Sequence, residues 1–278
     1  MFKLGEVILD WLNLIFGFWN NQVGLIFDLL GQSPTTFKGG GPWAIVERVE
    51  PIFVAVGCSL VVLFFVMGFC AESINIRDEM RFENILRMLM RLGIAQLLVI
   101  NNITFMKAFF QSVGSLVGLI GNTTGASISV ASEQAEIIKN LGFGQSLLFL
   151  IIAVLLSFII VVCGFFMLYT VYFRFLRIML VVPFGALAYS TLGSSAGISQ
   201  TATTYTKHFI GVTLESVTMA LAILVCNAFI NAGLPSFAGN YADWAKVLIY
   251  LCELTFAVAI TTGAVKGAQT LTAKMMGL

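Results

Sequence analysis

The chain has 278 residues, of which 59% are hydrophobic and 10% are charged. Soluble domains usually carry about 25% charged residues, so this composition excludes an ordinary soluble domain and predicts a protein that crosses a membrane several times. The net charge of +1 gives no overall attraction to nucleic acid, and we predict no sequence-specific nucleic-acid binding.

The first region, residues 1–32, reads as an amphipathic helix, and a linker follows at 33–42. Polar residues recur every three or four positions on one face, and the opposite face is apolar and includes Trp11 and Trp19. Tryptophan suits a membrane interface, so we expect the helix to lie there or to pack on the protein; spanning is the alternative. The linker, SPTTFKGGGP, predicts a break between two helices.

The remaining residues, 43–278, form a predicted transmembrane domain. The run from Pro51 to Ala71 has no charged residue and is long enough to cross a bilayer core of about 30 Å as a helix. Similar segments recur along the chain, so we predict an all-α, polytopic helical membrane protein with five transmembrane helices. The expected spans are about 51–71, 92–112, 144–173, 209–232 and 247–266.

The number of spans depends on a short apolar segment at 178–192, which contains Pro183. Proline removes a helical hydrogen bond, and the segment is shorter than the roughly 20 residues that a span needs. We therefore predict a turn at Pro183 and a re-entrant or interfacial segment, with a sixth span as the alternative.

Orientation follows from lysine and arginine, which collect in cytoplasmic loops. The charged connector at 72–91 and the region 174–177 are rich in arginine, whereas the loop between the second and third spans is not. We expect both arginine-rich regions to face the cytoplasm and the N-terminus to lie outside. Five spans then place the C-terminus in the cytoplasm.

Three polar residues within the predicted spans are candidates for function: Asn101, Asn102 and Glu253. An unpaired amide or carboxylate is costly in hydrocarbon. Such residues therefore either line a polar path or form hydrogen bonds between helices, and the sequence leaves both alternatives open.

Arginines at the predicted cytoplasmic boundary are candidates for docking to anionic lipid or to the acidic surface of a partner. Ordinary anchoring at the membrane surface is the alternative. These residues are Arg77, Arg81, Arg87 and Arg91 of the connector, together with Arg174 and Arg177, which lie on one helical face.

Glycine pairs at four-residue spacing occur in several apolar segments, for example Gly193 with Gly197 and Gly263 with Gly267. A side chain that is only a hydrogen atom lets two helices approach closely. These pairs favour tight helix packing or oligomerisation.

The sequence contains no recognisable catalytic or cofactor motif. Its five cysteines are not in CxxC spacing, its one histidine has no ligand cluster around it, and no phosphate-binding loop occurs. No nucleophile lies beside a base in a known arrangement. We therefore predict no metal site, no cofactor and no enzymatic activity.

Several segments follow one another in a recognisable order: AVGCSLVVLFFVMGFC at 55–70, RFENILRMLMRLGIAQLLVINN at 81–102, FRFLRIMLVVPFGALA at 173–188, TKHFIGVTLESV at 206–217 and a C-terminal GAQTLTAKMMGL. In these segments the chain resembles the TrbL-type (VirB-six-like) polytopic inner-membrane components of conjugative type IV secretion systems. The resemblance covers about 43–278. The arginine-bearing segment that runs into Pro183 is its most specific part.

This resemblance implies a protein of the bacterial cytoplasmic membrane that assembles as several copies among phospholipids. It also implies work with the ATPases and the periplasmic or surface subunits of the secretion system. We expect a structural, pore or platform subunit that supports DNA or protein transfer or pilus assembly. A small-molecule or ion transporter that uses Asn101, Asn102 and Glu253 is the alternative.

Overall fold

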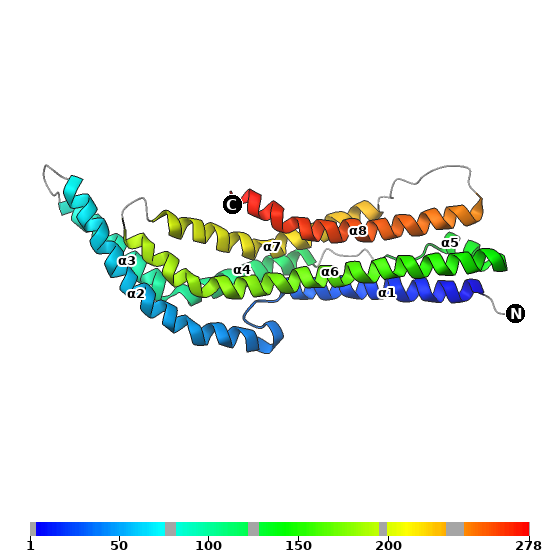
Figure 1. The fold of residues 1–278 in the computed structure, drawn as a ribbon, viewed down its shortest axis with the longest axis horizontal. Coiled ribbons are helices and arrows are strands. Elements are labelled where there is room, and N and C mark those ends of the chain that lie inside the picture. Colours follow the sequence, from blue (N-terminus) through cyan, green and yellow to red (C-terminus); the bar gives the residue numbers. More distant parts are fainter. Residues whose placement is uncertain (1–3, 76–81, 122–127, 195–198, 232–241, 278) are drawn as a thin grey trace. The chain divides into compact units, whose positions relative to one another are not determined.

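The computed structural model describes residues 4–75, 82–121, 128–194, 199–231 and 242–277. Regular structure in these ranges is entirely helical, which confirms the all-α prediction (Figure 1). Arg77 and Arg81 lie outside the described residues. The α-helices are α1 (Leu4–Gly31), α2 (Gly41–Asn75), α3 (Phe82–Ile100), α4 (Asn102–Gly121), α5 (Ser132–Lys139), α6 (Phe143–Ser190), α7 (Gln200–Asn231) and α8 (Asp243–Met275), with short 3-10 turns η1 (Phe37–Gly40) and η2 (Thr191–Gly193).

Five of the described helical segments are long and apolar enough to cross a membrane, which confirms a polytopic protein with five candidate spans. Helix α1 is not among them. The segments are Phe37–Cys70, Asn102–Gly121, Phe143–Gly193, Gln200–Ile230 and Trp244–Met275.

The second span does not lie where the sequence predicted it. The expected helix at 92–112 is divided at Asn101, so that α3 ends at Ile100 and α4 begins at Asn102. The side chain of Asn101 donates a hydrogen bond to the carbonyl of Leu97 at 3.0 Å. The backbone N–H of Asn101 donates to the same carbonyl at 3.0 Å, so the side chain shares this acceptor with the helix rather than replacing its backbone bond.

The segment 178–192 is neither a separate span nor a re-entrant segment. Helix α6 runs through it without interruption, and Pro183 lies inside the helix, so the predicted turn at Pro183 is wrong. At 48 residues, α6 is about 72 Å long at 1.5 Å per residue, which exceeds the roughly 30 Å of a bilayer core. The prediction of a turn failed because it was made from the sequence around Pro183 alone, without the contacts that α6 makes with other helices.

The chain forms two compact units, and the first comprises Met1–Gly31, Val117–Tyr172 and Ser216–Thr270. Within it, α1 buries its apolar face, including Ile8, Leu12 and Trp19. The indole of Trp11 donates a hydrogen bond to Ser157 of α6 at 2.7 Å. Helix α1 therefore packs on the protein, which was one of the placements the sequence allowed.

The described residues 128–131 lie outside any helix and are held on both sides within the first unit. Asn20 of α1 donates to the carbonyl of Ile128 at 2.9 Å and accepts from its N–H at 3.0 Å. Tyr250 of α8 donates to the carbonyl of Ser129 at 3.2 Å and accepts from the N–H of Ala131 at 3.0 Å. These side chains supply the partners that a backbone outside a helix lacks.

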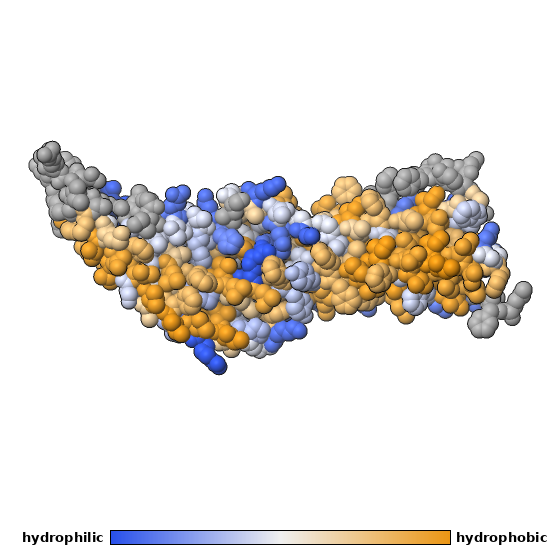
Figure 2. All heavy atoms as spheres, viewed as in Figure 1, coloured by the Kyte–Doolittle hydropathy of each residue, from blue (hydrophilic) through white to orange (hydrophobic). Residues whose placement is uncertain are grey.

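The second unit comprises Gln32–Leu116, Phe173–Glu215 and Leu271–Leu278. Its helix α2 presents apolar side chains outward, among them Val62, Leu63 and Val66. Figure 2 shows hydrophobic residues along the visible face of α2. Large exposed apolar faces on a helix of this length suit contact with lipid.

Candidate functional site

The second unit holds an ionic cluster, which we call the arginine–glutamate cluster, formed by Arg174 and Arg177 of α6 and Glu215 of α7. The Nη1 atom of Arg177 lies 2.7 Å from Oε1 of Glu215. The side chain of Arg177 is 28% exposed and that of Glu215 only 4%. The two arginines lie three positions apart, so one face of α6 brings both toward α7.

Arg174 is the most deeply buried charge of this cluster, at 2% exposure. Its guanidinium carbon lies 4.7 Å from the centre of the Phe175 ring, and Phe175 stacks on Phe37 with 4.1 Å between ring centres. Its Nε and Nη1 atoms, and Oε2 of Glu215, have no hydrogen-bond partner among the described residues. Glu215 forms its ion pair with Arg177, and its charge also acts on Arg174 from a greater distance. The cluster depends on Glu215 because buried charge is costly without a partner.

These positions correct the docking prediction for Arg174, whose guanidinium is buried in the second unit against the ring of Phe175. Arg177 is already engaged by Glu215. Arg87 and Arg91 are exposed on α3, so docking remains a prediction for these two. The pairing of Arg177 with Glu215 was missed from sequence, although Glu215 is the only charged residue between 208 and 242 and needed a partner.

A second cluster surrounds Pro183 and joins α4, α6 and α7 within the same unit. Asn102 is fully buried, and its amide donates to the carbonyl of Val182 at 3.1 Å. The hydroxyl of Tyr205 donates to the carbonyl of Val181 at 2.9 Å. Both acceptors directly precede Pro183, whereas the helical bond that the proline removes would have ended on the carbonyl of Met179, four residues earlier. The two side chains therefore do not replace that bond; they fasten α4 and α7 to α6 beside the proline.

Glycine makes this arrangement possible. A Cβ atom built on Gly185 would collide with Oδ1 of Asn102 and would lie 2.8 Å from Cε of Met106 and 2.9 Å from the hydroxyl of Tyr205. A Cβ atom on Gly57 of α2 would lie 2.8 Å from the carbonyl oxygen of Ala186. All of these separations are shorter than an ordinary van der Waals contact. Only glycine at these two positions therefore allows α2, α4 and α7 to approach α6 this closely around Pro183.

The adjacent asparagines do not form one polar face. Asn102 is buried against α6, whereas Asn101 is exposed and bonds to its own helix at Leu97. Glu50 of α2 is 9% exposed and lies beside the Asn102 amide and the backbone N–H of Ile103. A carboxylate at a helix N-terminus is favourable, so Glu50 helps to begin α4. Glu50 was missed from sequence because it lies just outside the uncharged run.

Replacing Asn102 with alanine should destabilise the protein by about 1–3 kcal/mol, since it removes a buried hydrogen bond between α4 and α6. Asn101→Ala is the matched control, and its effect should stay within about 0.5 kcal/mol because that side chain is exposed. Thermal unfolding of the detergent-solubilised variants measures both. Equal melting temperatures for the two variants would contradict this role of Asn102.

A further ionic contact links α2 to α4 in the second unit. Nζ of Lys107 lies 2.6 Å from Oε1 of Glu47, which also accepts a hydrogen bond from the Trp43 indole at 2.8 Å. Both charged side chains are over a third exposed, at 39% and 46%. Exposed pairs usually contribute at most about 1 kcal/mol, so this contact orients the helices more than it stabilises them.

Glu253 belongs to α8 in the first unit, whereas Asn101 and Asn102 belong to the second. It is half-buried, and its Oε1 atom has no hydrogen-bond partner among the described residues. Within the described part of the chain, no three His, Cys, Asp or Glu residues come together as metal ligands. The structure therefore uses Arg177 and Asn102 in hydrogen bonds between helices and leaves Glu253 as a separate polar position.

Long apolar helices joined by buried polar contacts define a multi-pass helical membrane protein. The chain belongs to the TrbL/VirB6 plasmid conjugal transfer like protein family, whose model matches residues 19–186, more than half of the chain. It is therefore a component of a conjugal transfer system. Asn102, Arg174, Arg177 and Pro183 lie within the match, and Glu215 lies beyond it. No curated protein and no solved structure matches the chain.

Proposed function

We propose that the chain is a structural subunit of a conjugative type IV secretion system that helps to build the membrane platform for transfer or pilus assembly. The observation that carries this proposal is the use of its buried polar groups. In the second unit, Arg177 with Glu215 and Asn102 with Val182 join helices of the same chain. A transporter needs such groups to face a solute path, whereas a platform subunit needs them to hold its helices together.

The finer features of this role are also proposals. The protein sits in the cytoplasmic membrane with its N-terminus outside and its C-terminus in the cytoplasm, because the arginine-rich regions around 72–91 and 174–177 favour the cytoplasmic side. It assembles as a homo-oligomer. Its partners are the ATPases and the periplasmic or surface subunits of the system, as expected for a component of a conjugal transfer system.

The test is to delete the gene for this chain in a strain that carries the transfer system and then to express the chain again from a second locus. We expect deletion to abolish transfer and to prevent co-isolation of the remaining subunits as one complex from solubilised membranes. Restoring the natural chain should recover both. Restoring Glu215→Ala should recover neither, because the arginine–glutamate cluster loses its carboxylate.

Two controls make the result specific. Arg48→Ala removes an exposed arginine of α2 and should restore transfer fully. Membrane levels of the other subunits, measured by immunoblotting, must be unchanged in the deletion strain. An intact complex without this chain would overturn the platform role. Solute uptake by vesicles that contain only the purified chain would favour a transporter instead.

A further inference from the structure

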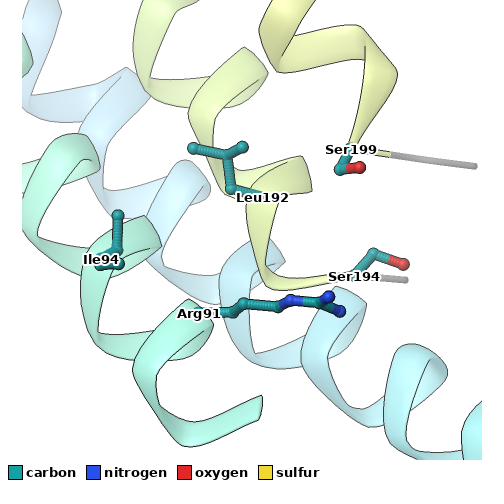
Figure 3. Close-up of a pocket in the computed structure, with 5 residues that line it drawn as sticks. All are labelled: Arg91, Ile94, Leu192, Ser194 and Ser199. Atoms are coloured by element: carbon teal, nitrogen blue, oxygen red, sulfur yellow. The ribbon is translucent and has the colours of Figure 1, made fainter. Parts of the chain in front are cut away.

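A small pocket of the second unit lies where α3 meets the segments around η2 and the start of α7. Its volume is about 340 Å³, at the lower end of the roughly 300–1,000 Å³ typical of small-molecule sites. The described residues that line it are Arg91, Ile94, Leu192, Ser194 and Ser199. Figure 3 shows the Arg91 side chain extending from α3 toward Ser194.

One polar atom of this pocket lacks a partner. Ser194 is 3% exposed, and its Oγ atom has no hydrogen-bond partner among the described residues. A buried hydroxyl without a partner is costly, so an acceptor that enters the pocket would be stabilised. The Arg91 guanidinium can offer parallel donors to the same acceptor, an arrangement that suits a phosphate group.

The pocket is also lined by apolar side chains, and apolar side chains of α3 are exposed at the surface. Ile94 and Leu192 form its walls, and Ile94 is 54% exposed on α3. Met90 and Leu97 are also exposed on α3, at 58% and 60%. A ligand that places an anion beside Arg91 would therefore have hydrocarbon surface next to it, as an amphipathic ligand requires.

Arg91 also lies where the sequence changes from charged to apolar. It is the last charged residue before an uncharged run that lasts until Lys107. Arg87 precedes it by one helical turn and is also exposed. A boundary of this kind is typical of the headgroup level of a bilayer, where arginine attracts anionic lipid.

We propose that this pocket binds the phosphate group of an anionic membrane phospholipid, with Arg91 and the Ser194 hydroxyl as donors and the acyl chains along the outer face of α3. The proposal does not depend on the platform role. It assigns lipid recognition to Arg91 in particular, and it excludes Arg174, which is buried elsewhere in the unit.

The test uses the full chain in a neutral detergent with added lipid. Phosphatidylglycerol or cardiolipin should raise the melting temperature of the natural protein, whereas phosphatidylcholine should not. Arg91→Ala should weaken anionic lipid binding by about tenfold or more, the loss expected for hydrogen bonds to a charged group. Ser194→Ala should weaken it less, since a neutral hydroxyl contributes less than a guanidinium.

Controls separate lipid recognition at this pocket from a general effect of positive charge. Arg48→Ala, an exposed arginine of α2 that does not line the pocket, should retain the full lipid response. The lipid response of Arg91→Ala is measured against the melting temperature of the same variant without lipid. An equal lipid response in the natural protein and Arg91→Ala would overturn the proposal, and so would an equal stabilisation by inorganic phosphate, which would indicate a site for a soluble anion.

Discussion

The variant Gly185→Ala should unfold at a clearly lower temperature than the natural protein, with a loss of about 1–3 kcal/mol. Alanine is favoured over glycine by roughly 1 kcal/mol inside a helix, so propensity alone predicts the opposite sign. Steric overlap should win, because the added methyl would press on the side chains of Asn102 and Tyr205. Both of these donate hydrogen bonds to α6, and displacing them breaks those bonds.

Thermal unfolding of the solubilised protein provides the measurement, and Gly263→Ala provides the matched control. Gly263 lies inside α8 and is exposed, and a methyl group added there would meet no described atom within 4 Å. This control should melt at the same temperature as the natural protein or slightly higher. Gly57→Ala should behave like Gly185→Ala, since its neighbour is the backbone of Ala186. A Gly185→Ala protein as stable as Gly263→Ala would contradict the close packing around Pro183.

The second large effect is expected for Glu215→Ala. Removing one partner of a buried ionic contact typically costs about 3–5 kcal/mol, because the remaining charge stays buried without compensation. Arg174, at 2% exposure, cannot turn to solvent, whereas the partly exposed Arg177 can. We therefore expect most of the loss to come from Arg174. The amount of folded protein recovered from membranes and its melting temperature measure the effect.

Removing the charge of Arg174 together with that of Glu215 should restore stability. The double variant Arg174→Met with Glu215→Gln leaves neither a buried cation nor a buried anion at these two positions, and it should recover much of what Glu215→Ala loses. Arg48→Ala, an exposed arginine on α2, should change stability by no more than about 0.5 kcal/mol. If Glu215→Ala proves as mild as Arg48→Ala, Glu215 does not hold the cluster together.

The sequence anticipated features that depend on nearby residues. The polar and apolar periodicity of 1–32 predicted a helix, and α1 spans Leu4–Gly31. The uncharged run after Pro51 predicted a span, and it lies within α2. Both signals are local, because hydrophobic periodicity and length are enough to specify an amphipathic or membrane-spanning helix.

The candidate site was harder to predict, and Asn101 and Asn102 show why. The two residues are identical and adjacent, yet one ends a helix at the surface and the other bonds to α6 in the interior. The difference arises from the position of Val182, 80 residues further along the chain. The role of Arg177 likewise depends on Glu215, 38 residues away on another helix.

The sequence by itself therefore determined the membrane class, the helical architecture and the number of candidate spans, since these follow from composition and local hydropathy. Only the tertiary structure decided that α6 continues through Pro183, that Arg174 is buried and that Arg91 lines a pocket. Each of these depends on side chains from distant segments that supply a donor, a counter-charge or a wall. The packing of the helices determines which residues become such partners, and the local sequence pattern does not predict them.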